Sequence, residues 1–248
     1  MPRIDLNCDL GEGAGHDAEL MPLITSANIA CGGHAGDEDT MRETCLLAWQ
    51  YGVAIGAHPS FEDREHFGRR EQPLTPKQVA DLVFTQTRRL QEIAVGCGGR
   101  VMHVKVHGAL YNLAARDPAL ARAVAEGARE ADPRLVLFAL AGSQLVTAGR
   151  AGGLTVASEV FADRTYQPDG SLTPRTRSNA MIEDEALAVA QVLHIVRDGR
   201  VRALGGASLA LHADTVCLHG DGPQPVAFAQ RLNRELAAAG IELKSFTT

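Results

Sequence analysis

Short apolar runs alternate with longer amphipathic segments from one end of the chain to the other. The runs have the length of buried strands, and the segments carry apolar residues at helical spacing. Repeated strand–helix units of this kind predict an α/β fold with a parallel sheet and right-handed crossovers. The predicted strands span residues 3–8, 28–31, 53–58, 101–107, 135–140, 155–161 and 214–220, with a last one at 241–246.

Capping residues mark where several helices begin and end. Asp37 is suited to the N-cap of a helix that runs to residue 51, where Gly52 ends it. Thr75, followed by Pro76 and Gln78, predicts a capping box and a helix that continues to residue 96. The other predicted helices lie on both sides of residues 117–118 and at 184–197 and 223–239.

Three of the predicted strands carry a polar stripe on one face. Strands in a parallel sheet are normally apolar on both faces, and successive side chains point to opposite sides. In RIDLNCD, VMHVKVHG and DTVCLHGD the apolar residues share one face and the polar residues share the other. The polar members are Asp5, Asn7 and Asp9; His103, Lys105 and His107; and Thr215, Cys217 and His219.

These polar stripes favour a closed barrel over an open sheet. Beneath the covering helices of an open sheet, unpaired charges would be very costly. Inside a barrel, the same acids, bases and amides can bond to one another, and barrel active sites lie at the carboxyl ends of the strands. We therefore expect an irregular α/β barrel of about seven parallel strands, formed by residues 1–248 as a single domain.

The ends of other strands add polar groups to the same rim. His58 ends the strand in GAHPS, and Glu159 and Arg164 lie at and just after the end of the strand in ASEVFADR. In SANIACGGHAGD, Gly32 and Gly33 let the backbone turn, which would direct the following His34 inward.

Composition narrows the class of protein. The net charge of −6 and the aromatic fraction of 4% argue against a nucleic-acid partner, which needs basic surfaces or stacking rings. Five cysteines without CxxC spacing indicate reduced thiols and a cytoplasmic protein. No signal peptide and no apolar run long enough to span a bilayer are recognised, so we expect no membrane association.

The rim residues allow two interpretations. His34, His58, His107 and His219, with Asp9, are suited either to a divalent metal such as Zn or Mg or to a metal-free hydrogen-bonded network. Within this group, the predicted metal ligands are Asp9, His58 and His107.

Lys105 is unexpected inside a strand. A buried lysine either pairs with carboxylates, here Asp5, Asp9 or Glu159, or serves as a cationic group in the chemistry.

The motifs DLNCDLGE, SANIACGGHAGD, GAHPSF, VKVHGALYN, SEVFADR and CLHGD, in order from residue 5 to 221, resemble the LamB/YcsF family. The resemblance covers nearly the whole chain and implies a barrel related to polysaccharide-deacetylase-like folds. It also implies the A subunit of a three-subunit 5-oxoprolinase, which with subunits B and C opens 5-oxo-L-proline to L-glutamate while hydrolysing ATP. The sequence does not indicate which of the three binds ATP, and a homo-oligomer stays open.

Candidate roles follow from the chemistry of a lactam. Opening a lactam through phosphorylation of its oxygen requires three groups. A cation stabilises the negative charge that develops, a base takes a proton from water, and an acid protonates the departing ring nitrogen. The catalytic candidates are Asp9, His34, His58, Lys105, His107 and His219, with Asp9, His58 or His107 as base and His34 or His219 as acid. The candidates for binding substrate or phosphate are Asn7, Glu12, Asn28, Tyr111, Glu159, Arg164 and Asp221.

Two alternatives to this function remain. The histidine- and aspartate-rich rim also suits a stand-alone metal-dependent deacetylase or amidohydrolase. A non-catalytic subunit that binds the lactam for its partners is the other alternative.

Overall fold

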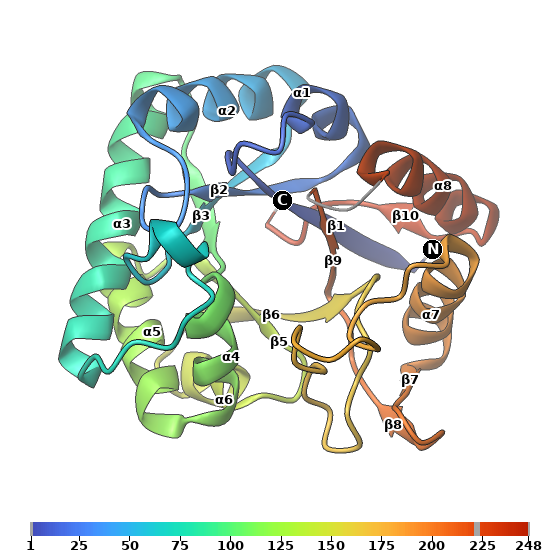
Figure 1. The fold of residues 1–248 in the computed structure, drawn as a ribbon. Helices are drawn as coiled ribbons and strands as arrows, with labels where there is room; N and C mark the ends of the chain where they lie inside the picture. Colours follow the sequence, from blue (N-terminus) through green and yellow to red (C-terminus); the bar gives the residue numbers. More distant parts are fainter. Residues whose placement is uncertain (1, 221–223, 248) are drawn as a thin grey trace.

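The strands of the computed structural model close into a parallel barrel with helices outside it (Figure 1). The structure describes residues 2–220 and 224–247. The barrel strands follow the chain in order, and the last pairs back with the first, which closes the cylinder. They are β1 (Arg3–Leu10), β2 (Ser26–Ala30), β3 (Ala54–His58), β4 (Val101–Val104), β5 (Val136–Leu140), β6 (Thr155–Phe161) and β9 (Thr215–His219).

Helices alternate with these strands, so the predicted α/β barrel of about seven parallel strands is confirmed. In Figure 1 they surround the strands, with α3 and α5 side by side. The longer helices are α2 (Glu38–Tyr51), α3 (Pro76–Gly96), α4 (Gly108–Arg116), α5 (Pro118–Ala131), α6 (Gln144–Ala151), α7 (Glu185–Asp198) and α8 (Pro225–Ala238). Shorter turns are α1 (Asp17–Leu20), η1 (Met21–Leu23) and η2 (Arg64–His66).

The predicted helix caps are present. The Asp37 carboxylate accepts a hydrogen bond from the backbone N–H of Thr40, and Gly52 ends α2 with a φ of 67°. Thr75 and Gln78 form the reciprocal capping box at the start of α3. These contacts satisfy backbone groups that have no partner inside the helix.

Several strand boundaries differ from the predicted ones. β2 begins at Ser26 instead of residue 28, and β4 ends at Val104 instead of residue 107. The chain after β4 nevertheless follows β3, because the N–H of Lys105 donates to the carbonyl of Ala57. The last strand, β10 (Glu242–Leu243), is shorter than predicted and pairs with β1.

Several elements were not predicted, among them the helix α6 and one hairpin. β7 (Arg200–Arg202) and β8 (Ser208–Ala210) form an antiparallel hairpin between α7 and β9. In the described parts of the chain, no helix combines the length and apolar character that crossing a bilayer requires.

The polar stripes of the strands meet inside the barrel. Near the amino-terminal ends of the strands, the carboxylate of Asp5 accepts hydrogen bonds from Thr25, Ser26 and Thr215. Two residues further along β1, Asn7 donates a hydrogen bond inside the barrel to Glu159. Leu6 and Cys8, on the opposite face of β1, belong to the apolar core.

Candidate functional site

Lys105 lies at the centre of a buried network of charges. Its ammonium nitrogen Nζ is 2.9 Å from Asp9 Oδ1, 3.0 Å from Glu159 Oε1 and 3.0 Å from Cys217 Sγ. Burial lowers the pKa of Lys105, but the charges of Asp9 and Glu159 and the hydrogen bond to Cys217 outweigh it and hold the pKa well above its ordinary value. Lys105 therefore stays cationic. Of its three predicted partners, Asp9 and Glu159 contact it. Asp5 instead accepts hydrogen bonds from hydroxyl groups near the amino-terminal ends of the strands.

Two asparagines orient the carboxylates of this network. Asn28 donates from Nδ2 to Asp9 Oδ1 at 2.8 Å and to Asn7 Oδ1 at 2.7 Å. Asn7 in turn donates to Glu159 Oε1 at 3.0 Å. Tyr111 donates its hydroxyl to the other oxygen of Glu159 at 2.6 Å. These four predicted binding residues thus meet in the structure, although Asn7 and Asn28 are fully buried and serve the network itself.

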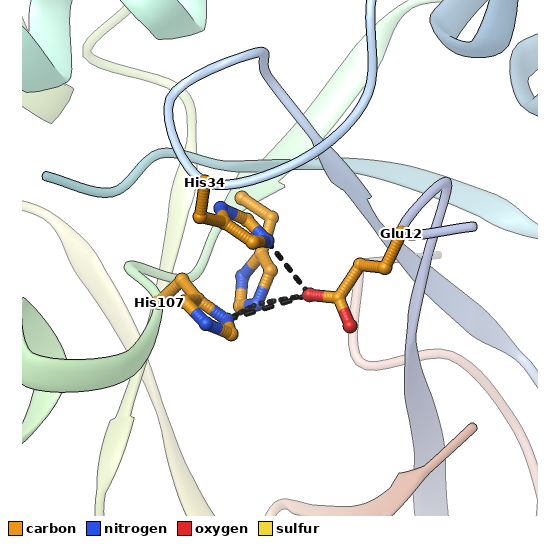
Figure 2. A group of neighbouring side chains, drawn as sticks. Glu12, His34 and His107 are labelled. Atoms are coloured by element: carbon orange, nitrogen blue, oxygen red, sulfur yellow. Dashed lines mark hydrogen bonds and ion pairs between the residues drawn. The ribbon is translucent and has the colours of Figure 1, made fainter. Parts of the chain in front are cut away.

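Three histidines and a glutamate form a second group, here called the imidazole cluster: Glu12, His34, His58 and His107. One ligand atom from each lies within 4.8 Å of all the others. His58 ends β3, His107 precedes α4, and the loops after β1 and β2 supply Glu12 and His34. Figure 2 shows the Glu12 carboxylate pointing toward the rings of His34 and His107.

The outward-facing nitrogen of each imidazole in the cluster has an oxygen partner. His58 Nδ1 donates to the carbonyl of Lys105 at 2.6 Å, and His107 Nε2 donates to that of Phe67 at 3.0 Å. The Ser60 hydroxyl donates to a backbone carbonyl, so it accepts from His34 Nδ1, 2.9 Å away. These bonds fix the tautomer of each neutral ring and turn its other nitrogen inward as a lone pair.

The inward atoms of the cluster are therefore acceptors that face one another. His58 Nε2 lies 2.9 Å from His107 Nδ1, and His34 Nε2 lies 2.8 Å from Glu12 Oε1. Lone pairs so close repel each other unless a cation lies among them. The donor set of three imidazoles and one carboxylate, each ring backed by an oxygen, is the set that binds divalent transition metals. These residues fit a metal ion.

Burial and neighbouring charges shift the pKa values of the three cluster histidines. Burial lowers the pKa of His34, and burial together with the charges of His58 and His34 holds the pKa of His107 well below its usual range. Burial also disfavours the charged form of His58, but the charge and hydrogen bond of Asp9 prevail and raise its pKa. A proton on His58 and a metal ion are thus competitors for the same position.

His219 ends β9, next to Asp9 on β1, and pairs with a carboxylate. Its Nδ1 is 2.8 Å from Asp163 Oδ2, and its ring stacks near Phe161 with centroids 5.7 Å apart. Burial raises the pKa of Asp163, but the charge and hydrogen bond of His219, with nearby arginines, bring it below the usual value. An aspartate that holds one ring nitrogen leaves the other free for proton transfer.

A cavity of about 1120 Å³ connects these groups to the surface. Its lining includes Asp9, Glu12, His58, Lys105, His107 and His219, together with Tyr111, Arg164 and the loop at 167–177. The structure therefore brings together all the predicted catalytic residues around one cavity, directly or in contact with its lining. Asp221 is the exception among the candidates, because it lies outside the described residues.

Some partners in the site escaped sequence reasoning. Ser60 follows His58 closely in GAHPS, and this proximity to a rim histidine was a usable signal. The carbonyl of Phe67, in the loop before α3, gave no signal because any residue supplies a carbonyl. Glu12 was assigned to substrate binding, whereas its carboxylate lies among the imidazoles.

The fold and site define a class: parallel α/β barrels with a histidine- and carboxylate-lined site at the carboxyl ends of the strands. A solved T48 deacetylase shares the fold, with a TM-score of 0.51, 14% identity and coverage of 98% of this chain and 87% of that one. Residues 4–248 match the LamB/YcsF family, and the chain belongs to that family.

Two relatives are much closer to the chain than this deacetylase. The A subunit of 5-oxoprolinase from Bordetella pertussis is 53% identical, over 98% of this chain and 99% of the relative. The crystal structure of the lactam utilization protein from Thermus thermophilus has a TM-score of 0.92 and 41% identity, covering 98% of this chain and 100% of that one.

Proposed function

We propose that this chain is the A subunit of an ATP-hydrolysing 5-oxoprolinase, which works with subunits B and C to open 5-oxo-L-proline to L-glutamate. Its relatives are named as the A subunit of 5-oxoprolinase and as a lactam utilization protein, and these names support this substrate class. The observation that carries the proposal is that one cavity is lined by Lys105, by His219 and by three members of the imidazole cluster, Glu12, His58 and His107. Five buried free thiols support a cytoplasmic location.

The chemistry requires activation of a stable amide. ATP transfers its terminal phosphoryl group to the lactam oxygen, which releases ADP and leaves the ring carbon electrophilic. Water then adds to that carbon and the ring C–N bond breaks, which leaves a γ-glutamyl phosphate. A second water hydrolyses this acyl phosphate, and phosphate leaves with the former lactam oxygen. The products are L-glutamate, ADP and phosphate. We assign the water addition and ring opening to this chain and leave open which of the three subunits binds ATP.

Each step has a matching group in the cavity. Lys105 places a fixed positive charge near the oxygen that becomes negative, and its pairing with Asp9 and Glu159 holds it in place. Asp9 is the ionised carboxylate at the cavity wall and takes the proton of the attacking water. His219, oriented by Asp163, gives a proton to the departing ring nitrogen.

Glu12, His34, His58 and His107 would hold a divalent transition-metal ion such as Zn, because three imidazoles suit Zn better than Mg. Such an ion supplies Lewis-acid charge where negative charge develops. The same cluster favours one second candidate, a metal-dependent amidohydrolase that needs neither ATP nor partners, and the fold shared with a deacetylase is consistent with it.

A glutamate-release assay with 5-oxo-L-proline tests these proposals. The chain alone, the chain with subunits B and C, and each of these without ATP are compared. We expect glutamate only from the complete mixture with ATP. Release by the chain alone without ATP would establish the second candidate instead.

A variant at the proposed acid separates a catalytic from a merely binding subunit. His219→Asn should lower glutamate release by the complete mixture about 100-fold or more, the usual contribution of general acid catalysis. His194→Asn removes an exposed imidazole on α7 that pairs only with Asp198, and it should leave the rate unchanged. Full activity of His219→Asn would show that His219 is not the acid.

A further inference from the structure

Arg164 is a buried cation without an acidic partner in the described part of the chain. Its side chain follows β6 at the cavity wall, and only 4% of the residue is exposed. One hydrogen bond holds the guanidinium: Nη2 donates to the carbonyl of Thr173 at 2.6 Å. Its Nε is buried and has no partner among the described residues. A charge buried with so few bonds is costly unless an anion completes it.

The surrounding charges increase this cost. Burial and the nearby Arg175 lower the pKa of Arg164 to about 10. The adjacent carboxylate of Asp163 is already bound by His219, at 2.8 Å. Two other cations of the cavity are neutralised by acids: Lys105 by Asp9 and Glu159, and Arg116 by Glu71.

The backbone around Arg164 is held rigidly. The side-chain amide of Gln191 on α7 donates to the carbonyl of Arg164 at 2.9 Å and to that of Phe161 at 3.1 Å. Arg164 also forms an antiparallel bridge with Met181. A guanidinium held in place before the ligand arrives loses little entropy on binding.

We propose that Arg164, supported by Arg175, binds the carboxylate of the lactam substrate. This assignment rests on the proposed function and adds the residue that selects a carboxylated lactam over an uncharged one. A guanidinium binds a carboxylate through two parallel hydrogen bonds, which fixes orientation as well as charge.

The position of Arg164 relative to the proposed acid agrees with the chemistry of the substrate. In 5-oxoproline the ring nitrogen is bonded to the carbon that carries the carboxylate. The acid that protonates this nitrogen must therefore lie next to the carboxylate subsite. His219 is bound by Asp163, the residue directly before Arg164. The imidazole cluster and Lys105 then face the lactam carbonyl on the other side of the nitrogen.

The test compares two lactams that differ only in the carboxylate, 5-oxo-L-proline and 2-pyrrolidinone. Their equilibrium binding to the chain is measured by calorimetry or ligand-observed NMR, and their ring opening is measured with the complete three-subunit mixture. Arg164→Gln should weaken 5-oxoproline binding and lower its kcat/KM about 10- to 100-fold, the effect of losing hydrogen bonds to a charged group. For 2-pyrrolidinone the two proteins should differ less than about threefold.

Two further variants complete the design. Arg164→Lys keeps the charge but loses the paired geometry, so it should recover only part of the 5-oxoproline affinity. Arg88→Gln removes an exposed arginine on α3, outside the cavity, and should leave both lactams unaffected. Unchanged binding of 2-pyrrolidinone by Arg164→Gln also shows that this variant is folded.

The remaining outcomes overturn the proposal. Unchanged 5-oxoproline affinity in Arg164→Gln would show that no carboxylate binds there. Equal losses for both lactams would assign Arg164 to a phosphate or to structure. If the wild-type mixture opens neither lactam, the proposed function fails, while the binding comparison still decides the carboxylate subsite.

Discussion

At the scale of single residues, Lys105 connects the stability of the barrel to its chemistry. The Lys105→Met variant would leave Asp9 and Glu159 as two buried carboxylates without their shared cation. Breaking a buried pair in this way costs about 3–5 kcal/mol. We expect a loss of that size in the free energy of unfolding from urea titrations, together with loss of glutamate release by the complete mixture.

Lys77→Met is the matched control for this variant. Lys77 pairs with Asp81 at 3.2 Å on the exposed face of α3, and such a pair contributes less than about 1 kcal/mol. An unfolding free energy of Lys105→Met equal to that of the wild type would contradict the buried charge network.

His103 gives the protein a predictable response to acid. The ring is fully buried, stacks on Phe138 at 4.2 Å and donates from Nε2 to Asn28 Oδ1 at 2.8 Å. Burial, with the charges of Lys105 and His58, lowers its pKa from 6.5 to about 3. Between these values the unfolded chain binds a proton that the folded chain does not bind, so stability is complete above pH 6.5 and falls as the pH decreases toward 3.

The expected size of this response follows from the same shift. Between about pH 7.5 and about pH 5, the wild type should lose about 2 kcal/mol more unfolding free energy than His103→Gln, which cannot titrate. Urea titrations at both pH values measure the difference. Equal pH dependence of the two proteins would mean that His103 is protonated in the folded state.

At the scale of elements, the ring of His103 on β4 lies so close to β3 that position 56 has no room for a side chain. A Cβ at Gly56 would lie 1.9 Å from His103 Nε2 on β4, well inside any real contact. Gly56→Ala should therefore lower the unfolding free energy by about 3 kcal/mol or more. Adding His103→Ala removes the obstructing ring, and the double variant should be more stable than Gly56→Ala alone.

The control lies at the end of α3. A Cβ at Gly96 meets only Arg42 at 4.0 Å, and Gly96→Ala should be neutral or stabilising by up to about 1 kcal/mol. Thermal or urea unfolding of the wild type and these variants measures the effects. A Gly56→Ala variant as stable as the wild type would contradict the close contact of the two strands.

Elements that depend on neighbouring residues in the sequence could be predicted, and those that depend on contacts with distant residues could not. The caps at Asp37 and Thr75 depend on neighbours within four residues, and both helices begin where predicted. The β7–β8 hairpin was missed because Arg200–Arg202 is too short to show an alternating pattern of its own. The early end of β4 depends on its pairing with β3 and β5, and the sequence of β4 alone does not indicate where this pairing stops.

At the scale of the whole molecule, closure of the barrel explains why the polar stripes are tolerated. Their alternation predicted that Asp9, Lys105 and Cys217 would face a common interior, and the structure brings them into contact. The composition of the imidazole cluster could not be derived in the same way. It depends on how the loops after β1 and β2 return to the rim, and no strand period fixes the positions of Glu12 and His34.

The proposed function depends most on the imidazole cluster, which we propose holds a divalent metal ion required for lactam opening. The direct measurement is glutamate release by the complete mixture after this chain has been stripped with a chelator and then reloaded with Zn, Mn or Mg. Metal content per chain is determined in parallel for the wild type and for His58→Ala with His107→Ala.

We predict about one metal ion per wild-type chain, almost none in the double variant, and glutamate release that disappears on stripping and returns on reloading. Full glutamate release by a stripped chain that contains no metal would contradict the claim.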